Sequence, residues 1–153
     1  MPNQSEKIDD LLNDIEVNCD PAIGSRACIR FYLDCLRLIS HKLPPIAEEG
    51  LAVATAYVEG RASVEVVTDA IVKCWQYLDE KHKHAPTSDP NVSIIRAVLF
   101  PLYAEKNPEE RDVVDHLSLF LAFVNTVEPH YEEQETLLRT HFSDCLKARA
   151  RMR

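Results

Sequence analysis

The chain has 153 residues, 46% of them hydrophobic and 27% charged, which is the composition of one ordinary globular domain. Its formal net charge of -8 at pH 7 argues against a surface that neutralises phosphates, so we expect no nucleic-acid partner. The chain has no run of 18 apolar residues, and no basic segment followed by an apolar one at its start. We therefore expect a soluble cytoplasmic protein that does not engage a membrane.

The first 45 residues have the apolar spacing of two helices. In the first, four apolar side chains follow the i, i+3, i+4, i+7 pattern of a helix that buries one face: Ile8, Leu11, Leu12 and Ile15. A second helix is predicted to begin after Asp20-Pro21, because proline suits the first helical turn. It should end at Pro44-Pro45.

The middle of the chain predicts a helical hairpin. A third helix should run from about Pro45 to Glu59 and end with Gly60 as its C-terminal cap. Its small residues would let a neighbouring helix approach closely. The fourth should begin after Ser63 and reach about Lys81. Its packing stripe is predicted from five apolar residues, Val67, Ile71, Cys74, Trp75 and Leu78.

Three more helices are predicted in the second half, after a loop at residues 83–90. The fifth should begin at Pro90 and be kinked or ended at Pro101. Asn107-Pro108 is a strong start signal for the sixth, which is apolar almost all round and should be central. The last should follow Pro129. The sequence thus predicts an all-α fold, in which residues 1–153 form a single-domain irregular bundle of about seven helices.

The cysteine content favours a reducing compartment. There are five cysteines, an odd number, and four of them occupy apolar helical phases where a thiol packs as a small hydrophobe. We therefore expect reduced and mostly buried thiols. The five are Cys19, Cys28, Cys35, Cys74 and Cys145.

The sequence lacks the common motifs of catalysis and cofactor binding, so we expect no enzyme and no cofactor. The strongest metal candidate combines Asp112, Asp115 and His116, of which Asp112 and His116 are spaced i, i+4 on one helix. A metal site needs three or four convergent ligands, and no second helix offers a matching face. Exposed helix charges therefore explain these residues better, and we expect no bound metal.

Acidic side chains are the remaining feature from which a function can be inferred. They would suit a basic protein partner, because complementary potentials speed association and select partners. A solvated helix face is the alternative interpretation. The residues proposed for partner binding are four near the last helix, Glu128, Glu132, Glu133 and Glu135, and three on the first, Asp9, Asp10 and Asp14.

The central hairpin resembles one found in a known class of proteins. The stretch from Leu51 to Ser63 is alanine-rich and ends as Tyr57-Val-Glu-Gly60, and a second helix follows from Val64 to Trp75. It resembles the central helix pair of the α-helical immunity proteins of bacterial polymorphic toxin systems. The resemblance implies a cytoplasmic inhibitor that binds a cognate toxin domain and blocks its active site.

Two other classes of function compete with this one. A helical adaptor or regulatory subunit would also act through protein–protein contacts and would also lack catalytic motifs. An all-helical metal-dependent nucleotide hydrolase would instead use Asp112, Asp115 and His116. The sequence specifies neither the partner nor the oligomeric state.

Overall fold

The computed structural model describes residues 3–19, 21–84, 89–103 and 113–146, with only the backbone of residues 21–26, 82–84 and 113–114. This part of the chain is helical and has no strand, which confirms the all-α prediction. A short 3-10 turn, η1, covers Ser40–Lys42. The labelled α-helices of the described residues are α1 (Gln4–Asn18), α2 (Pro21–Leu38), α3 (Pro45–Val58), α4 (Val64–His84), α5 (Pro90–Tyr103), α6 (Val113–Val127) and α7 (Tyr131–His141).

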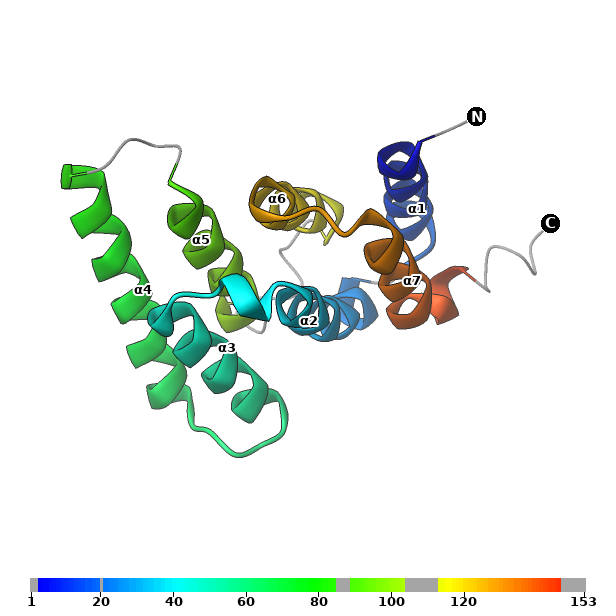
Figure 1. Cartoon of the computed structure of the whole chain (residues 1–153). Coiled ribbons are helices and arrows are strands. Elements are labelled where there is room, and N and C mark those ends of the chain that lie inside the picture. Colours follow the sequence, from blue (N-terminus) through cyan, green and yellow to red (C-terminus); the bar gives the residue numbers. More distant parts are fainter. Residues whose placement is uncertain (1–2, 20, 85–88, 104–112, 147–153) are drawn as a thin grey trace.

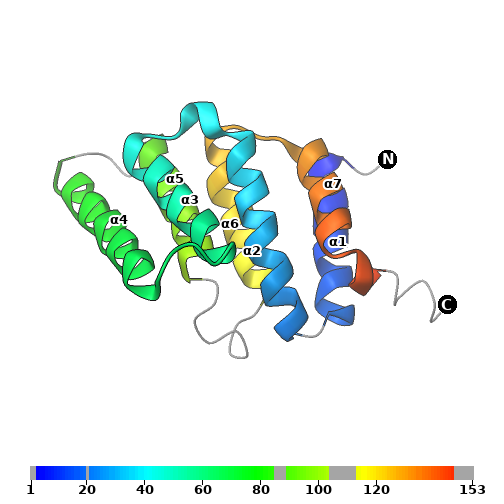
Figure 2. The ribbon, with the colours of Figure 1, turned by 90° about the horizontal axis from the view of Figure 1, so that it is seen from below.

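The helices form a bundle with α2 and α6 at its middle. Helices α3, α4 and α5 lie on one side of this pair, and α1 and α7 lie together on the other (Figures 1 and 2). Helix α2 packs against α3, α5, α6 and α7, and α6 packs against α1, α2 and α5. Among the described helices, none has both the length and the apolar character needed to cross a bilayer.

Aromatic rings from four parts of the chain meet in the core. Phe31 and Tyr32 of α2 contact Phe120 of α6 with ring centroids 6.2 and 4.5 Å apart. Phe100 of α5 lies 5.7 Å from Phe120, and Phe142, just after α7, lies 6.4 Å from Phe31. Tilted and edge-on aromatic pairs add to the stabilisation from burial. This cluster confirms the prediction that the sixth helix is central.

The predicted hairpin of α3 and α4 is present. Gly60 has a φ of 76°, a left-handed conformation that favours glycine. The Arg61 amide donates to the Ala56 carbonyl at 2.7 Å, which closes the end of α3 as a glycine cap does. At the start of α4, the Val66 amide donates to Ser63 Oγ at 3.4 Å. Both predicted caps are therefore confirmed.

Three details of the helices differ from the sequence prediction. Helix α2 ends at Leu38, before the η1 turn, and not at Pro44-Pro45, and α4 continues to His84. Helix α5 runs through Pro101 to Tyr103, so of the two predicted effects of this proline an end of the helix is excluded. Trp75 was expected in the packing stripe of α4, but its side chain is 42% exposed. It follows Cys74 directly, and one helical step of about 100° turns it away from the buried face. The start signal at Asn107-Pro108 lies outside the described residues.

The expectation of reduced thiols is wrong for two cysteines. Cys19 caps the C-terminus of α1, and Cys145 follows α7; a disulfide joins them, with Cα atoms 5.1 Å apart. The pairing arises from tertiary packing, because α1 lies along α7 and brings positions 126 residues apart together. Helical phase alone, from which a buried thiol at Cys145 was inferred, carries no information on this neighbour.

The other three cysteines are buried thiols outside any disulfide, as predicted. Burial raises the pKa of Cys74 to about 11, with a smaller contribution from the Glu49 carboxylate. Burial, and to a lesser extent Asp34, raise the pKa of Cys35 well above its ordinary value. Because the thiolate is the reactive form, both side chains are poor nucleophiles in the folded protein.

We expect the disulfide to stabilise the bundle. Removing a native disulfide of a small domain costs about 2–5 kcal/mol in unfolding free energy, because the unlinked unfolded chain gains entropy. The Cys19→Ser/Cys145→Ser variant should stay folded and melt at a lower temperature than the oxidised protein. Dithiothreitol provides the control: it should lower the melting temperature of the wild type and leave that of the variant unchanged. A wild type insensitive to reductant would contradict the pairing.

Gly50 allows α3 and α5 to approach closely. A Cβ built on this glycine would lie 2.6 Å from Val98 Cγ1, which is closer than real Cβ contacts come. Val98 is fully buried, and its β-branched side chain has little freedom to move aside. The small residues of the third helix thus serve the packing against α5.

Gly50→Ala should therefore destabilise the fold. Overpacking costs about 1–3 kcal/mol, more than the roughly 0.5–1 kcal/mol that alanine gains over glycine within a helix. Urea unfolding of Gly50→Ala, Val98→Ala and the double variant measures the effect. In the Val98→Ala background, Gly50→Ala should leave the free energy of unfolding unchanged or raise it. If Gly50→Ala stabilises the protein that retains Val98, the close contact is contradicted.

Candidate functional site

Helix α7 presents an acidic face away from the core. Gln134 and Leu138 are buried one helical turn apart and mark the packing side of α7, whereas Glu132 and Glu133 are exposed. Glu132 and Glu133 lie in the first turn, where the positive end of the helix dipole favours carboxylates. The acidic face therefore lies at the N-terminus of α7, where the helix dipole stabilises negative charge.

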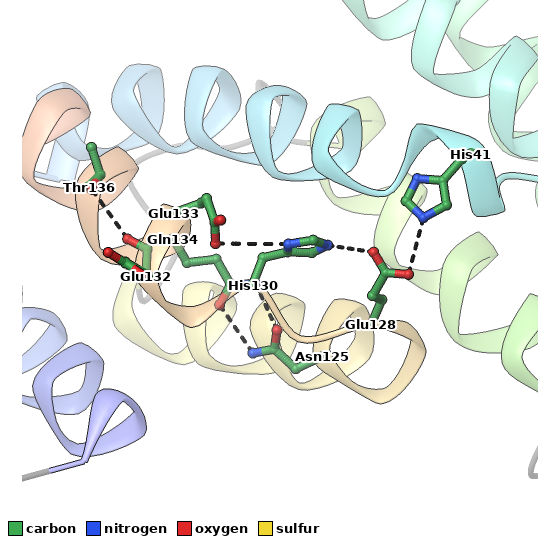
Figure 3. Close-up of polar contacts among 8 residues, drawn as sticks. All are labelled: His41, Asn125, Glu128, His130, Glu132, Glu133, Gln134 and Thr136. Atoms are coloured by element: carbon green, nitrogen blue, oxygen red, sulfur yellow. Dashed lines mark hydrogen bonds and ion pairs between the residues drawn. The ribbon is translucent and has the colours of Figure 1, made fainter.

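A pair of amides fixes this helix against α6. The Gln134 side chain donates to Asn125 Oδ1 at 2.7 Å, and the Asn125 side chain donates to Gln134 Oε1 at 3.2 Å (Figure 3). Gln134 is the one buried polar or charged side chain among the described residues. A buried amide without hydrogen-bond partners would destabilise the fold. This reciprocal pairing therefore fixes the position of α7 relative to α6.

The turn before α7 is held by a carboxylate between two imidazoles. Glu128 Oε1 lies 2.6 Å from His130 Nε2, and Glu128 Oε2 lies 3.1 Å from His41 Nε2 in η1 (Figure 3). The other nitrogen of His130 is 3.8 Å from Glu133 Oε2. Hydrogen bonds to His41, and then to His130, lower the pKa of Glu128 below its ordinary value. This contact ties the end of α6 to the end of α2.

Between α2 and α7 lies a cavity of about 550 Å³, which we call the acidic groove. Asp34 and Leu38 contribute from α2, and Glu132, Glu133, Thr136 and Leu137 from α7. Three of these side chains are carboxylates and two are leucines. The groove can therefore accept a cationic side chain while its aliphatic stem packs on apolar surface.

Asp34 has internal partners as well as a place in the groove. It accepts from Arg37 Nη1 at 2.7 Å, and it lies 2.7 Å from His141 Nε2 on α7. The side chain of His141 is only 16% exposed. Asp34 therefore helps to hold α7 on α2, and the more accessible negative charge of the groove comes from Glu132 and Glu133.

The four predicted glutamates near the last helix have different environments. Glu132 and Glu133 line the acidic groove and are exposed. Glu128 is engaged by two histidines, and Glu135 lies 3.5 Å from Arg139 on its own helix. The structure thus brings two of the four together at the groove.

The three predicted aspartates of α1 form no part of that groove. Asp9 lines a separate cavity of about 380 Å³ with residues of α1, α6 and Tyr131. Asp10 is exposed and Asp14 is half-buried. The two cavities share no lining residue, so the two acidic sets are alternative surfaces.

Sequence reasoning did not identify Asp34, His41 and His130 as parts of this region. Asp34 was visible as a charge within the apolar pattern of the second helix. Nothing in the sequence linked it to residues about a hundred positions later, because that link requires α7 to pack on α2.

The metal candidate is only partly within the described residues. Asp115 is exposed, and His116 is half-buried with its ring 6.2 Å from that of Phe100. Asp112 lies outside the described residues. Within the part that is described, no group of three or more histidine, cysteine or carboxylate side chains could hold a metal ion.

Comparison with known proteins identifies no relative of this chain. No protein-family model, no curated protein and no solved structure matches it.

The contact of Glu128 with the two histidines predicts a pH-dependent contribution to stability. A carboxylate whose pKa is lowered by folding stabilises the native state above its ordinary pKa, which for Glu128 is 4.5. Glu128→Gln should therefore unfold at lower urea concentration than the wild type near neutral pH. The difference should shrink as pH falls below about 4.5, toward the lowered value. Glu132→Gln, in the first turn of α7, serves as the control with a smaller expected effect. A pH-independent difference would contradict this role of Glu128.

Proposed function

We propose that this protein binds a basic protein partner in the acidic groove, and that the partner is a cognate toxin domain whose active site it blocks. The observation that carries the proposal is the placement of Glu132 and Glu133 beside Leu38 and Leu137 in one groove. Carboxylates around apolar side chains suit a partner whose surface offers lysine or arginine next to apolar residues.

The energetics favour this groove over a merely solvated acidic surface. Exposed charges alone contribute little affinity, whereas apolar contacts shielded from water can contribute much of it. In the groove both kinds of group are present, and α7 is held in place by its contacts with α2 and α6. A rigid surface loses little conformational entropy on binding.

The toxin-directed form of the proposal rests on the α3–α4 hairpin. Its Tyr57-Val-Glu-Gly60 ending and alanine-rich first helix resemble the helix pair of α-helical immunity proteins. Nuclease toxins present basic clefts to their substrates, and an acidic inhibitor would be steered toward such a cleft. A helical adaptor is the alternative if no toxin is bound.

An immunity role would place the protein in the cytoplasm, where cellular reductants keep most thiols reduced. The proposal therefore requires the partner to be bound without the Cys19–Cys145 disulfide. Binding should be measured with the oxidised protein and with the Cys19→Ser/Cys145→Ser variant. The proposal predicts the same interface in both.

The decisive experiment is co-expression with the protein encoded beside it. An equimolar complex should co-purify, and growth should be rescued from the toxicity of the partner. Glu132→Lys/Glu133→Lys should slow association by about tenfold at low salt, because steering depends on charge complementarity, with a smaller effect on dissociation. Stopped-flow measurements at several salt concentrations separate the two rates.

Asp9→Lys/Asp10→Lys is the matched control, since it changes the net charge by the same amount on the rival surface. An effect confined to this control would move the interface to α1 and reject the groove. Absence of both co-purification and growth rescue would reject the toxin partner. The melting temperature of each variant shows whether a loss of binding reflects unfolding.

A further inference from the structure

A further cavity lies among α4, α5 and α6, with a volume of about 350 Å³. We call it the aromatic cavity. Helix α5 lies between α4 and α6 and packs against both (Figures 1 and 2). Its lining shares no residue with the acidic groove. The six aromatic and aliphatic residues that matter most are Trp75, Leu99, Phe100, Tyr103, Leu119 and Phe123.

Burial is graded from the floor of this cavity to its rim. Leu99 is buried, and Phe100, Tyr103 and Phe123 are half-buried. Trp75 and Leu119 are 42% and 51% exposed, although both are large apolar side chains. A concave apolar surface with exposed aromatic groups at its edge is typical of a ligand site, and a scattered exposed leucine would need no such explanation.

The rings of the cavity are already positioned with respect to one another. Trp75 Nε1 donates to the Tyr103 hydroxyl at 2.9 Å, which links α4 to α5. The ring of Phe100 lies 6.2 Å from those of both His116 and Phe123, edge-on to the first and tilted to the second. Another aromatic ring entering here would find both ring faces and ring edges, the arrangement that aromatic pairs prefer.

The charges of the lining differ from those of the molecule as a whole. Among the lining residues that the structure describes there is no carboxylate, and Arg96 and His116 are the residues that can carry positive charge. The whole chain has a formal net charge of -8. The lining therefore disfavours a cationic ligand more than a neutral or anionic one.

We propose that the aromatic cavity binds a small planar aromatic molecule of one or two rings, neutral or anionic. Its volume lies near the lower end of the roughly 300–1,000 Å³ typical of ligand pockets, which limits the size of the occupant. The site is independent of the proposed toxin-binding role, because it uses other helices and other chemistry.

Trp75 gives the test a specific signal, because it is the only tryptophan of the chain. The probes are 2-naphthoate and 2-naphthylmethylammonium, which share a ring system and differ in charge. Calorimetry should show one molecule of naphthoate bound per protein, with a change in Trp75 emission and a raised melting temperature. The ammonium compound should bind several-fold more weakly.

Leu119→Glu tests the location, since a carboxylate at the rim would have to be desolvated against the ligand. It should weaken naphthoate binding by about tenfold or more. Leu119→Ala, which adds no charge, should weaken it to a smaller extent and serves if the glutamate variant does not fold. Val64→Glu is the matched control, because Val64 is 55% exposed on α4 outside the cavity; it should bind as the wild type does.

Three results would overturn the proposal. These are no binding of naphthoate, binding without a change in Trp75 emission, and binding unaffected by Leu119→Glu. Equal or tighter binding of the ammonium probe would overturn the charge preference. If naphthoate does not bind while Leu119→Glu abolishes capture of a protein partner, the cavity is part of a protein interface and the small-molecule proposal is wrong.

Discussion

The docking of α7 onto α2 and α1, with an amide pair joining it to α6, is the interaction on which the candidate site depends. Leu138 and Phe142 are buried, and the Phe142 ring meets that of Phe31 in α2. Apolar burial supplies most of the free energy of docking, and the Gln134–Asn125 pair and the Asp34–His141 contact determine its register. Without this docking Asp34 and Leu38 would not face Glu132, Glu133 and Leu137, and there would be no groove.

The same bundle produces two chemically different surfaces. On the α2 and α7 side, carboxylates surround two leucines, which suits a basic protein surface. Among α4, α5 and α6, aromatic rings line a cavity in which the described residues include no carboxylate. Because the two surfaces share no residue, the binding of a protein at one and of a small molecule at the other are separable properties.

The all-α class and the approximate helix boundaries could be predicted from the sequence, because both depend on local signals. Gly60 ends α3 and Ser63 begins α4 through backbone conformation and short-range hydrogen bonds. The disulfide and the groove could not be predicted, because each joins positions about a hundred or more residues apart. Trp75 shows the limit of periodicity: one helical step separates a buried side chain from an exposed one.

In the proposed site, α7 forms a fixed wall of the acidic groove against α2. The most direct test is a nuclear Overhauser measurement in solution on the full chain, with selectively labelled phenylalanine. If α7 is docked on α2, cross-peaks should appear between the rings of Phe31 and Phe142, whose centroids lie 6.4 Å apart, together with slow amide exchange in the middle of α7. Absent cross-peaks and fast exchange throughout α7 would contradict this docking, because α7 and its acidic residues would then not be packed against α2.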